Sequence, residues 1–354
     1  MSRKLITIST IMTLMSTSVI ADVPNVAADI APIHSLVSRV MDGVGAPKLI
    51  VQSGASPHGY RLRPSEAKAL QDADHVFWMG EELTPWLDSA IGTLASKASV
   101  TTLLDQQGVI LHDFREGALF EAHDHSAHGD DDHDDHDDHD DHDDHDDHDD
   151  HDDHKDHDDH DDHDDHKDHD DHDDHDDHDD HDDHGSHDPH AWLSPENAKL
   201  WLNIIASKLS VSDPENAATY FMNAAAGQAE IEAMIAEVKA TLKSVQGGKF
   251  VVFHDAYQYF ENDFDFYASG AISLGDSSDP SHARIEKVQK RIRDEGIQCV
   301  LAEPQFKKGL VATVMEGSDA TASVIDPLGA ELETGPKLYT RLIKNMAKIL
   351  RNCL

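Results

Sequence analysis

An Asp-Asp-His repeat runs almost unbroken from Asp130 to Asp183 and divides the chain into two segments of ordinary composition. Histidine recurs at every third position from His133 to His184, and the same phase continues to His190. A period of three matches neither a helix nor a strand, and the tract has essentially no apolar residue to offset the entropy of ordering. We therefore expect a disordered loop, over about residues 121–187, inserted into a protein that folds from the flanking segments.

The tract also accounts for most of the charge. Residues 130–184 hold 35 Asp and two Lys and so carry −33 of the formal net charge of −43. The remaining residues are mildly acidic, which argues against nucleic acid as a partner because phosphate binding requires a basic surface. An acidic, histidine-rich chain is instead compatible with metal cations.

The N-terminus has the pattern of a secretory signal. Arg3 and Lys4 supply a positive start, residues 5–15 an apolar stretch, and Ala21 ends a small-residue cleavage site, which predicts a signal peptide over residues 1–21. The apolar stretch is too short for a stable membrane span. No cysteine follows the predicted cleavage site, so we expect a soluble periplasmic protein that is not lipidated.

Apolar strands alternate with helical patterns on both sides of the tract, which indicates βαβ units and mostly parallel sheets. We expect an α/β fold of two lobes, each with a parallel-rich sheet flanked by helices, joined by one long helix. The predicted division is an N-terminal lobe over 22–212, a linking helix over 213–246 and a C-terminal lobe over 247–354. The expected strands are 23–30, 48–52, 75–79, 100–104, 250–253, 264–271, 298–302 and 321–325. The other expected helices are 33–41, one beginning at Pro64, 86–94, 195–209, 255–261, 282–295, 309–316 and 337–352.

The chain contains two cysteines, Cys299 and Cys353. In an oxidising compartment an even pair favours a disulfide, which would join the C-terminal helix to a strand of its own lobe. The alternative is two buried free thiols.

Four residues stand where strands end or where loops lead into helices: His58, His190, His254 and Asp326. The carboxyl ends of parallel strands face the ligand crevice of an α/β protein. Three imidazoles and one carboxylate make a tetrahedral site suited to Zn²⁺. The alternatives are loop histidines with satisfied backbone contacts, and for Asp326 a helix cap or turn former before proline.

Five motifs occur in order and together carry a resemblance. They are Ser53–Tyr60, Asp188–Leu193, Phe253–Tyr257, Ala302–Phe306 and Ile325–Gly329. The chain resembles the zinc-binding periplasmic component of ABC importers, the ZnuA-type branch of the cluster A-I solute-binding proteins. The likeness covers nearly all of the expected mature chain outside the tract.

The resemblance implies that His58, His190 and His254 bind the metal and that Asp326 can supply a carboxylate. Manganese-binding relatives usually place a glutamate at the position of His254, so imidazole there favours zinc. Many relatives carry an acidic residue just before the first histidine, but here Pro57 stands in that place. Asp326 or a water molecule must then complete the zinc coordination.

Glu303 ends a strand in the fourth motif. It is a candidate for orienting a metal ligand through a hydrogen bond. A cap or a hydrogen bond between the lobes is an equally good explanation for a glutamate at this place.

The resemblance predicts a monomeric, non-enzymatic protein that captures Zn²⁺ between two lobes and delivers it to a membrane ABC permease. The tract is expected to bind further zinc weakly, as a reserve or a sensor, or else to be a low-complexity expansion with incidental metal affinity. A zinc buffer or a metal-dependent envelope adhesin is the alternative. A zinc hydrolase is less favoured because the sequence offers no general base beside the site and none of the usual hydrolytic motifs.

Overall fold

The computed structural model describes residues 23–115, 120, 187–273, 275, 280–305 and 308–354. Its contacts separate one unit, residues 1–121 with 184–354, from a second unit, residues 122–183. The second unit, the predicted signal peptide and nearly all of the predicted loop lie outside the described residues.

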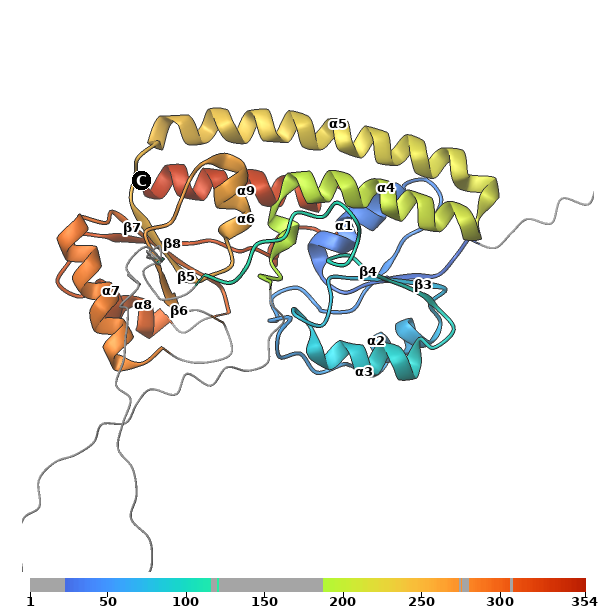
Figure 1. The fold of residues 1–354 in the computed structure, drawn as a ribbon, viewed down its shortest axis with the longest axis horizontal. Helices are drawn as coiled ribbons and strands as arrows, with labels where there is room; N and C mark the ends of the chain where they lie inside the picture. The colour runs from blue at the N-terminus through green and yellow to red at the C-terminus, as the bar shows by residue number, and fades with distance from the viewer. Residues whose placement is uncertain (1–22, 116–119, 121–186, 274, 276–279, 306–307) are drawn as a thin grey trace, which may run out of the picture. The chain divides into compact units, whose positions relative to one another are not determined.

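The N-terminal segment builds a four-stranded parallel sheet in the order β2-β1-β3-β4. Its strands are β1 (Val26–Ala28), β2 (Lys48–Leu49), β3 (His75–Trp78) and β4 (Ser99–Thr102). Helices α2 (Pro64–Gln71) and α3 (Pro85–Leu94) cover one face and α1 (Ala31–Val40) lies on the other (Figure 1). Leu70 and Leu87 of the two covering helices are fully buried in one cluster with Val76 of the sheet.

The C-terminal segment repeats this plan in the order β6-β5-β7-β8, again with parallel pairing. Its strands are β5 (Phe250–His254), β6 (Ala271–Ser273), β7 (Cys299–Ala302) and β8 (Thr321–Val324). Its helices are α6 (Gln258–Phe264), α7 (His282–Glu295) and α8 (Lys308–Met315). In both sheets the strand order reverses beside the first strand, and such a reversal is where α/β proteins place their ligands. His254 ends the strand at that point of the second sheet.

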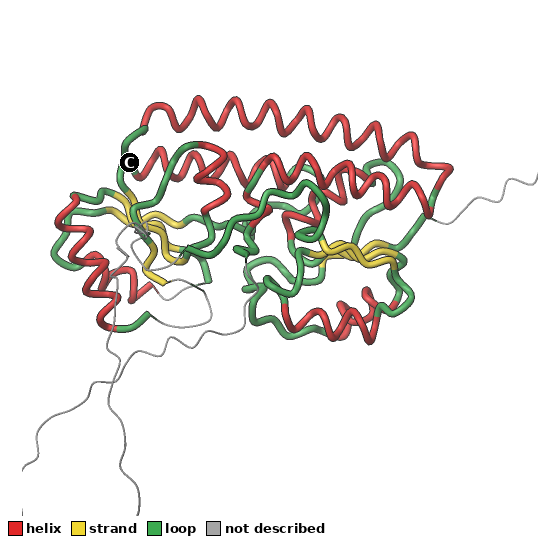
Figure 2. Tube along the Cα trace, viewed as in Figure 1, coloured by secondary structure: helices red, strands yellow, loops and turns green. Residues whose placement is uncertain are grey.

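Three further helices lie on the same side of the structure as α1. They are α4 (Pro195–Ser212), α5 (Ala217–Leu242) and α9 (Leu338–Cys353). Helix α5 lies against α4 and α1 along one part of its length and against α9 along another (Figure 2). Short 3₁₀ turns extend it at both ends, η3 (Pro214–Asn216) and η4 (Lys243–Val245). None of the helices in the described ranges is both long and apolar enough to span a membrane.

These features confirm the expected α/β class, with two parallel sheets flanked by helices and one long helix between them. The exact limits of the two lobes, 22–212 and 247–354, stay a prediction.

The predicted strand over 264–271 is wrong. Helix α6 continues to Phe264, the chain then turns through Asp265 in a left-handed conformation with φ of 49°, and β6 occupies only Ala271–Ser273. Phe264 and Phe266 are nonetheless buried, at 7% and 4% exposure. Their side chains anchor a helix end and a loop to the core. Because buried loop residues are apolar, the sequence pattern of this segment resembled that of a strand.

A disulfide joins Cys299, at the start of β7, to Cys353, at the end of α9. The expected pairing is thus confirmed. It fastens the last helix to the second sheet.

Candidate metal centre

His58 lies in the loop that follows β2. The Trp86 indole N–H donates a hydrogen bond of 2.7 Å to the carbonyl of Pro57, and the His58 backbone N–H donates to the Ser56 hydroxyl at 3.3 Å. The side chain of His58 is half-buried. Helix α3 therefore holds the loop in place while the imidazole keeps access to solvent.

His190 lies at the start of the short helical turn η2 (Ala191–Leu193), just after the tract. Its Nδ1 atom is 2.6 Å from a carboxylate oxygen of Asp188, which also accepts the His190 backbone N–H at 2.9 Å. Both side chains are buried, at 5% and 1% exposure. Burial raises the pKa of Asp188 to about 6, although the backbone N–H of His190 and the guanidinium of Arg115 lower it.

His254 has the same kind of support from the second sheet. Its Nδ1 atom is 2.6 Å from Glu303, which follows β7, and both residues are 3% exposed. The second Glu303 oxygen accepts a hydrogen bond of 2.8 Å from the Gln305 amide. A carboxylate on Nδ1 fixes the ring orientation, and Nε2 is the nitrogen by which such a histidine binds a metal.

The three rings approach one another through His190. Ring centroids are 5.6 Å apart for His58 and His190 and 5.3 Å apart for His190 and His254. Two imidazoles on one tetrahedral Zn²⁺, with Zn–N near 2.0–2.1 Å, would have centroids about 5 Å apart. Across the described residues no group of three or more His, Cys, Asp or Glu is already arranged to hold a metal ion. The spacings of these two pairs nevertheless suit a shared ion.

Asp326 follows β8 and performs the turn-forming role that was the alternative to ligation. Its carboxylate accepts backbone N–H groups from Leu328 at 2.9 Å, from Gly329 at 3.0 Å and from Ala330. The Trp192 indole donates to the carbonyl of Pro327 at 2.9 Å, which ties the segment of His190 to this turn. A carboxylate has about four acceptor positions, so one remains. Whether Asp326 binds the metal stays a prediction.

An ion pair beside the histidines was not predicted from the sequence. The Arg115 guanidinium contacts Asp255, directly after His254, and approaches Glu261 to 2.6 Å. Asp255 and Glu261 are both buried. Burial raises the pKa of each carboxyl group, and Arg115 opposes that rise. Nothing in the sequence near Arg115 marks it, because its partners lie about 140 residues away.

The chain on either side of the tract meets next to this ion pair. Asp113 and His187 form an antiparallel bridge, and the Asp188 backbone N–H donates to the carbonyl of His112 at 2.8 Å. The Tyr259 hydroxyl accepts the His112 backbone N–H at 3.1 Å and donates to the Asp188 carbonyl at 2.7 Å. Two segments that are far apart in sequence are thus joined next to His190.

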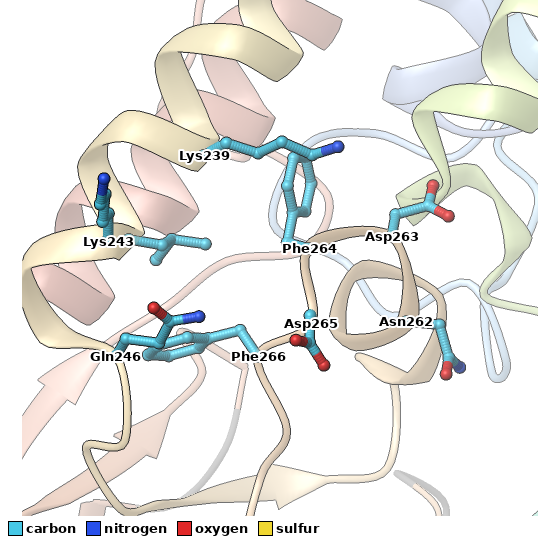
Figure 3. Close-up of a pocket in the computed structure, with 9 residues that line it drawn as sticks. Lys239, Lys243, Gln246, Asn262, Asp263, Phe264, Asp265 and Phe266 are labelled. Atoms are coloured by element: carbon cyan, nitrogen blue, oxygen red, sulfur yellow. The ribbon is translucent and has the colours of Figure 1, made fainter.

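A cavity among the described residues lies elsewhere, between the end of α5 and the loop after α6 (Figure 3). It measures about 330 Å³ and is lined by Lys239, Leu242, Lys243, Gln246, Asn262, Asp263, Phe264, Asp265 and Phe266. None of the predicted ligands lines it. A metal ion bound by side chains needs no cavity of this size, so this hollow does not bear on the metal site.

Comparison with known proteins supports the motif resemblance. Residues 26–353 match the family described as "Zinc-uptake complex component A periplasmic". The chain is 47% identical over 329 residues to a high-affinity zinc uptake system protein ZnuA from Brucella abortus, covering 93% of this chain and 91% of that protein. It is 43% identical over 335 residues to the protein of the same name from Paracoccus denitrificans, covering 94% and 93%.

Solved structures show the same fold. A crystal structure of ZnuA has a TM-score of 0.66 at 19% identity, covering 94% of this chain and 99% of that one. A mutant structure of the laminin-binding adhesin Lmb from Streptococcus agalactiae also has a TM-score of 0.66, at 18% identity and the same coverage. At these identities the structures support the fold alone, whereas the family match and the relatives of 43–47% identity decide membership. The chain belongs to the family of periplasmic A components of zinc-uptake complexes.

Proposed function

We propose that this protein captures Zn²⁺ with His58, His190, His254 and Asp326 and releases it to a membrane ABC permease. The observation that carries the proposal is the paired support of the buried histidines. Nδ1 of His190 faces Asp188 and Nδ1 of His254 faces Glu303, each at 2.6 Å. Oriented in this way, both imidazoles present Nε2, the arrangement by which carboxylate-supported histidines bind zinc.

The site belongs to a carrier that works without catalysis. A zinc hydrolase needs a base beside a metal-bound water, and the buried carboxylates Asp188 and Glu303 are instead engaged by histidine Nδ1 atoms. The relatives of 43–47% identity are named as high-affinity zinc uptake proteins. Their names favour import over adhesion or storage. The protein acts as a periplasmic monomer, after removal of residues 1–21.

Zinc titration of single-site variants tests the proposal. His58→Ala, His190→Ala and His254→Ala should each weaken tight zinc binding by about 100-fold or more, because each removes one of the few protein ligands that a zinc site has. His282→Ala is the matched control, since His282 is exposed at the start of α7. Retention of wild-type affinity in the three site variants would overturn the assignment.

Delivery to a permease is tested in cells. A strain that lacks the protein should grow poorly only when zinc is scarce, and the His190→Ala protein should fail to restore growth. If growth under zinc limitation did not change, storage or adhesion would become the better explanation.

A further inference from the structure

Arg115 makes a buried ion pair with two carboxylates at once. Its Nε atom donates to both oxygens of Asp255, at 3.1 and 3.0 Å, and its Nη1 atom donates to Glu261 at 2.6 Å. Asp255 and Glu261 are 7% and 1% exposed. The ring centroid of Phe120 lies 3.6 Å from the guanidinium carbon. Desolvation offsets much of the attraction in a buried ion pair, so stability alone is a weak reason for such an arrangement.

The backbone of Arg115 belongs to a segment that is paired with the one carrying His190. Residues 112–115 run beside residues 187–188 and are joined to them by an antiparallel bridge and a backbone hydrogen bond of 2.8 Å. The carboxylate of Asp188 then contacts Nδ1 of His190 at 2.6 Å. The pairing therefore fixes Arg115 relative to His190.

The side chain of Arg115 reaches the segment that carries the other buried histidine. Asp255 directly follows His254 at the end of β5, and Glu261 lies in α6. A guanidinium presents its donors in a rigid planar fork, so contact with two carboxylates fixes direction as well as distance. Arg115 thus connects the segment of His190 to the loop after His254. The ring centroids of these two histidines are 5.3 Å apart.

We propose that Arg115 is a positioning residue for zinc, which keeps the imidazoles of His190 and His254 at the spacing that one ion requires. The Tyr259 hydroxyl is a further link, through the main chain of both paired segments, whereas Arg115 contacts the residue directly after His254. Ligands that are held in place before the ion arrives lose less freedom on binding, so the ion should leave more slowly. The inference rests on the proposed zinc site.

Arg115→Lys tests this role because it keeps the positive charge and loses the fork. Zinc release into excess chelator should become about threefold to tenfold faster. This is less than the roughly 10- to 100-fold loss of affinity that follows when the direct partner of a metal-bound histidine is removed. The absorption spectrum of the cobalt-substituted protein should also change, because it depends on the geometry of the ligands.

Arg39→Lys is the matched control. The Arg39 guanidinium also makes a forked contact, with Glu230 at 3.2 and 3.1 Å, but it joins α1 to α5 and not two ligand segments. This variant should change neither zinc release nor the cobalt spectrum. If Arg115→Lys also keeps the wild-type release rate and the wild-type spectrum, the proposal is overturned.

A triple variant separates positioning from stability. Arg115→Met/Asp255→Asn/Glu261→Gln removes all three charges, so no carboxylate of this ion pair stays buried without its partner. The metal-free triple variant should melt near the wild type, yet its zinc release should stay fast and its cobalt spectrum altered. If it does not fold, or if it has the release rate and spectrum of the wild type, the ion pair acts on stability alone and the proposal fails.

The outcome for Arg115 can be distinguished from the outcome for the zinc site itself. If His190→Ala loses zinc while both Arg115 variants behave like the wild type, only the role of Arg115 fails. If His190→Ala keeps zinc, the proposed function fails.

Discussion

Two buried histidines of the proposed site depend on single carboxylates for their orientation. Glu303 holds His254 from the neighbouring strand, and Asp188 holds His190 from two residues away along the chain. An imidazole whose Nδ1 atom is fixed loses less freedom when Nε2 binds a metal. Affinity should therefore depend on residues that do not themselves touch the ion.

Replacing Glu303 tests this dependence. Glu303→Gln keeps the shape of the side chain but removes the charge that strengthens the hydrogen bond to His254, so zinc affinity should fall about 10-fold or more. Chelator competition measures the change. Glu333→Gln, at an exposed glutamate, serves as the control. Equal affinity in both variants would show that Glu303 has only a structural role.

Asp29 gives a prediction for stability against pH. Its carboxylate is fully buried after β1 and accepts N–H groups from Ile30 and Met79, each at 2.7 Å. Burial raises its pKa from 3.8 to about 7, although both backbone donors lower it. Between pH 4 and pH 7 the folded state thus keeps a proton that the unfolded state has released, so stability falls as pH rises through this window.

The size of the Asp29 contribution is at most about 4 kcal/mol. The metal-free protein should therefore lose unfolding free energy between pH 5 and pH 8, and Asp29→Asn should lose less over the same interval. Denaturant titration at both pH values measures the two differences. The comparison uses the change in unfolding free energy between the two pH values in each protein. Any pH-independent cost of the amide in Asp29→Asn therefore cancels. Equal slopes in the two proteins would remove Asp29 as the cause.

The extent to which sequence predicted this site differs between residues. His190, His254 and Asp326 stand at strand ends or in recognisable motifs, and the structure brings the histidine rings to within 5.3 Å. Asp188 could have been predicted as a partner, since it stands two residues before His190. Arg115 could not, because its role depends on contacts with residues about 140 positions away.

At the level of single elements, helix α5 packs closely against its neighbours at its one glycine. A Cβ atom on Gly227 would lie 2.9 Å from a methyl carbon of Leu202 in α4 and 3.1 Å from Cγ of Arg39 in α1. The absence of a side chain at this position lets three helices approach one another.

Gly227→Leu should therefore lower the free energy of unfolding by about 1–3 kcal/mol, the usual cost of adding volume to a packed core. Ala226→Leu adds a similar side chain to an exposed position one residue earlier and should have little effect. Thermal or denaturant unfolding of both variants measures the difference. Similar stability in the two would mean that the helices separate freely at this crossing.

The disulfide is the second prediction that belongs to an element. Cys299 and Cys353 are 54 residues apart, and closing a loop of that length restricts the unfolded chain by about 4 kcal/mol in the chain-entropy estimate. Reduction should lower the melting temperature, and the Cys299→Ala/Cys353→Ala protein should melt near the reduced wild type. Reductant should leave that variant unchanged. A wild-type melting temperature that does not respond to reductant would contradict the expected contribution.

Sequence patterns predicted the helices well where the spacing of apolar residues and the residues typical of helix ends agree. The limits of α7 match the expected 282–295, and Pro64 begins α2 as expected. The segment 264–271 was misread because buried Phe264 and Phe266 belong to a helix end and a loop. Local apolar content cannot distinguish a strand from a loop that is anchored in the core.

At the scale of the whole molecule, the two sheets share one strand order, and two of the three histidines adjoin them, one for each sheet. His58 lies in the loop after β2 of the first sheet, and His254 ends β5, an inner strand of the second. The folded segments on either side of the tract thus contain every proposed ligand. Tight binding should accordingly survive loss of the tract.

Deleting residues 130–184 tests this separation. The deletion removes −33 of the −43 formal charge and most of the histidines. Calorimetric titration should find one tight zinc ion in both proteins and additional weak binding only in the full chain. The weak binding should diminish as pH falls toward 6, because the acidic surroundings favour protonated imidazole. It should also diminish in high salt, which screens the field of the aspartates.

A full-length variant in which the histidines of residues 133–184 are replaced by glutamine separates the two contributions of the tract. If imidazoles bind the weak zinc, this variant should behave like the deletion although its charge is unchanged. If the aspartates alone attract the ion, it should retain the weak binding. Loss of the tight ion on deletion would place the principal site in the tract and contradict the assignment to His58, His190 and His254. If the tight ion instead survives the deletion, the charge of the tract accelerates capture without deciding affinity, as long-range fields act mainly on association rates.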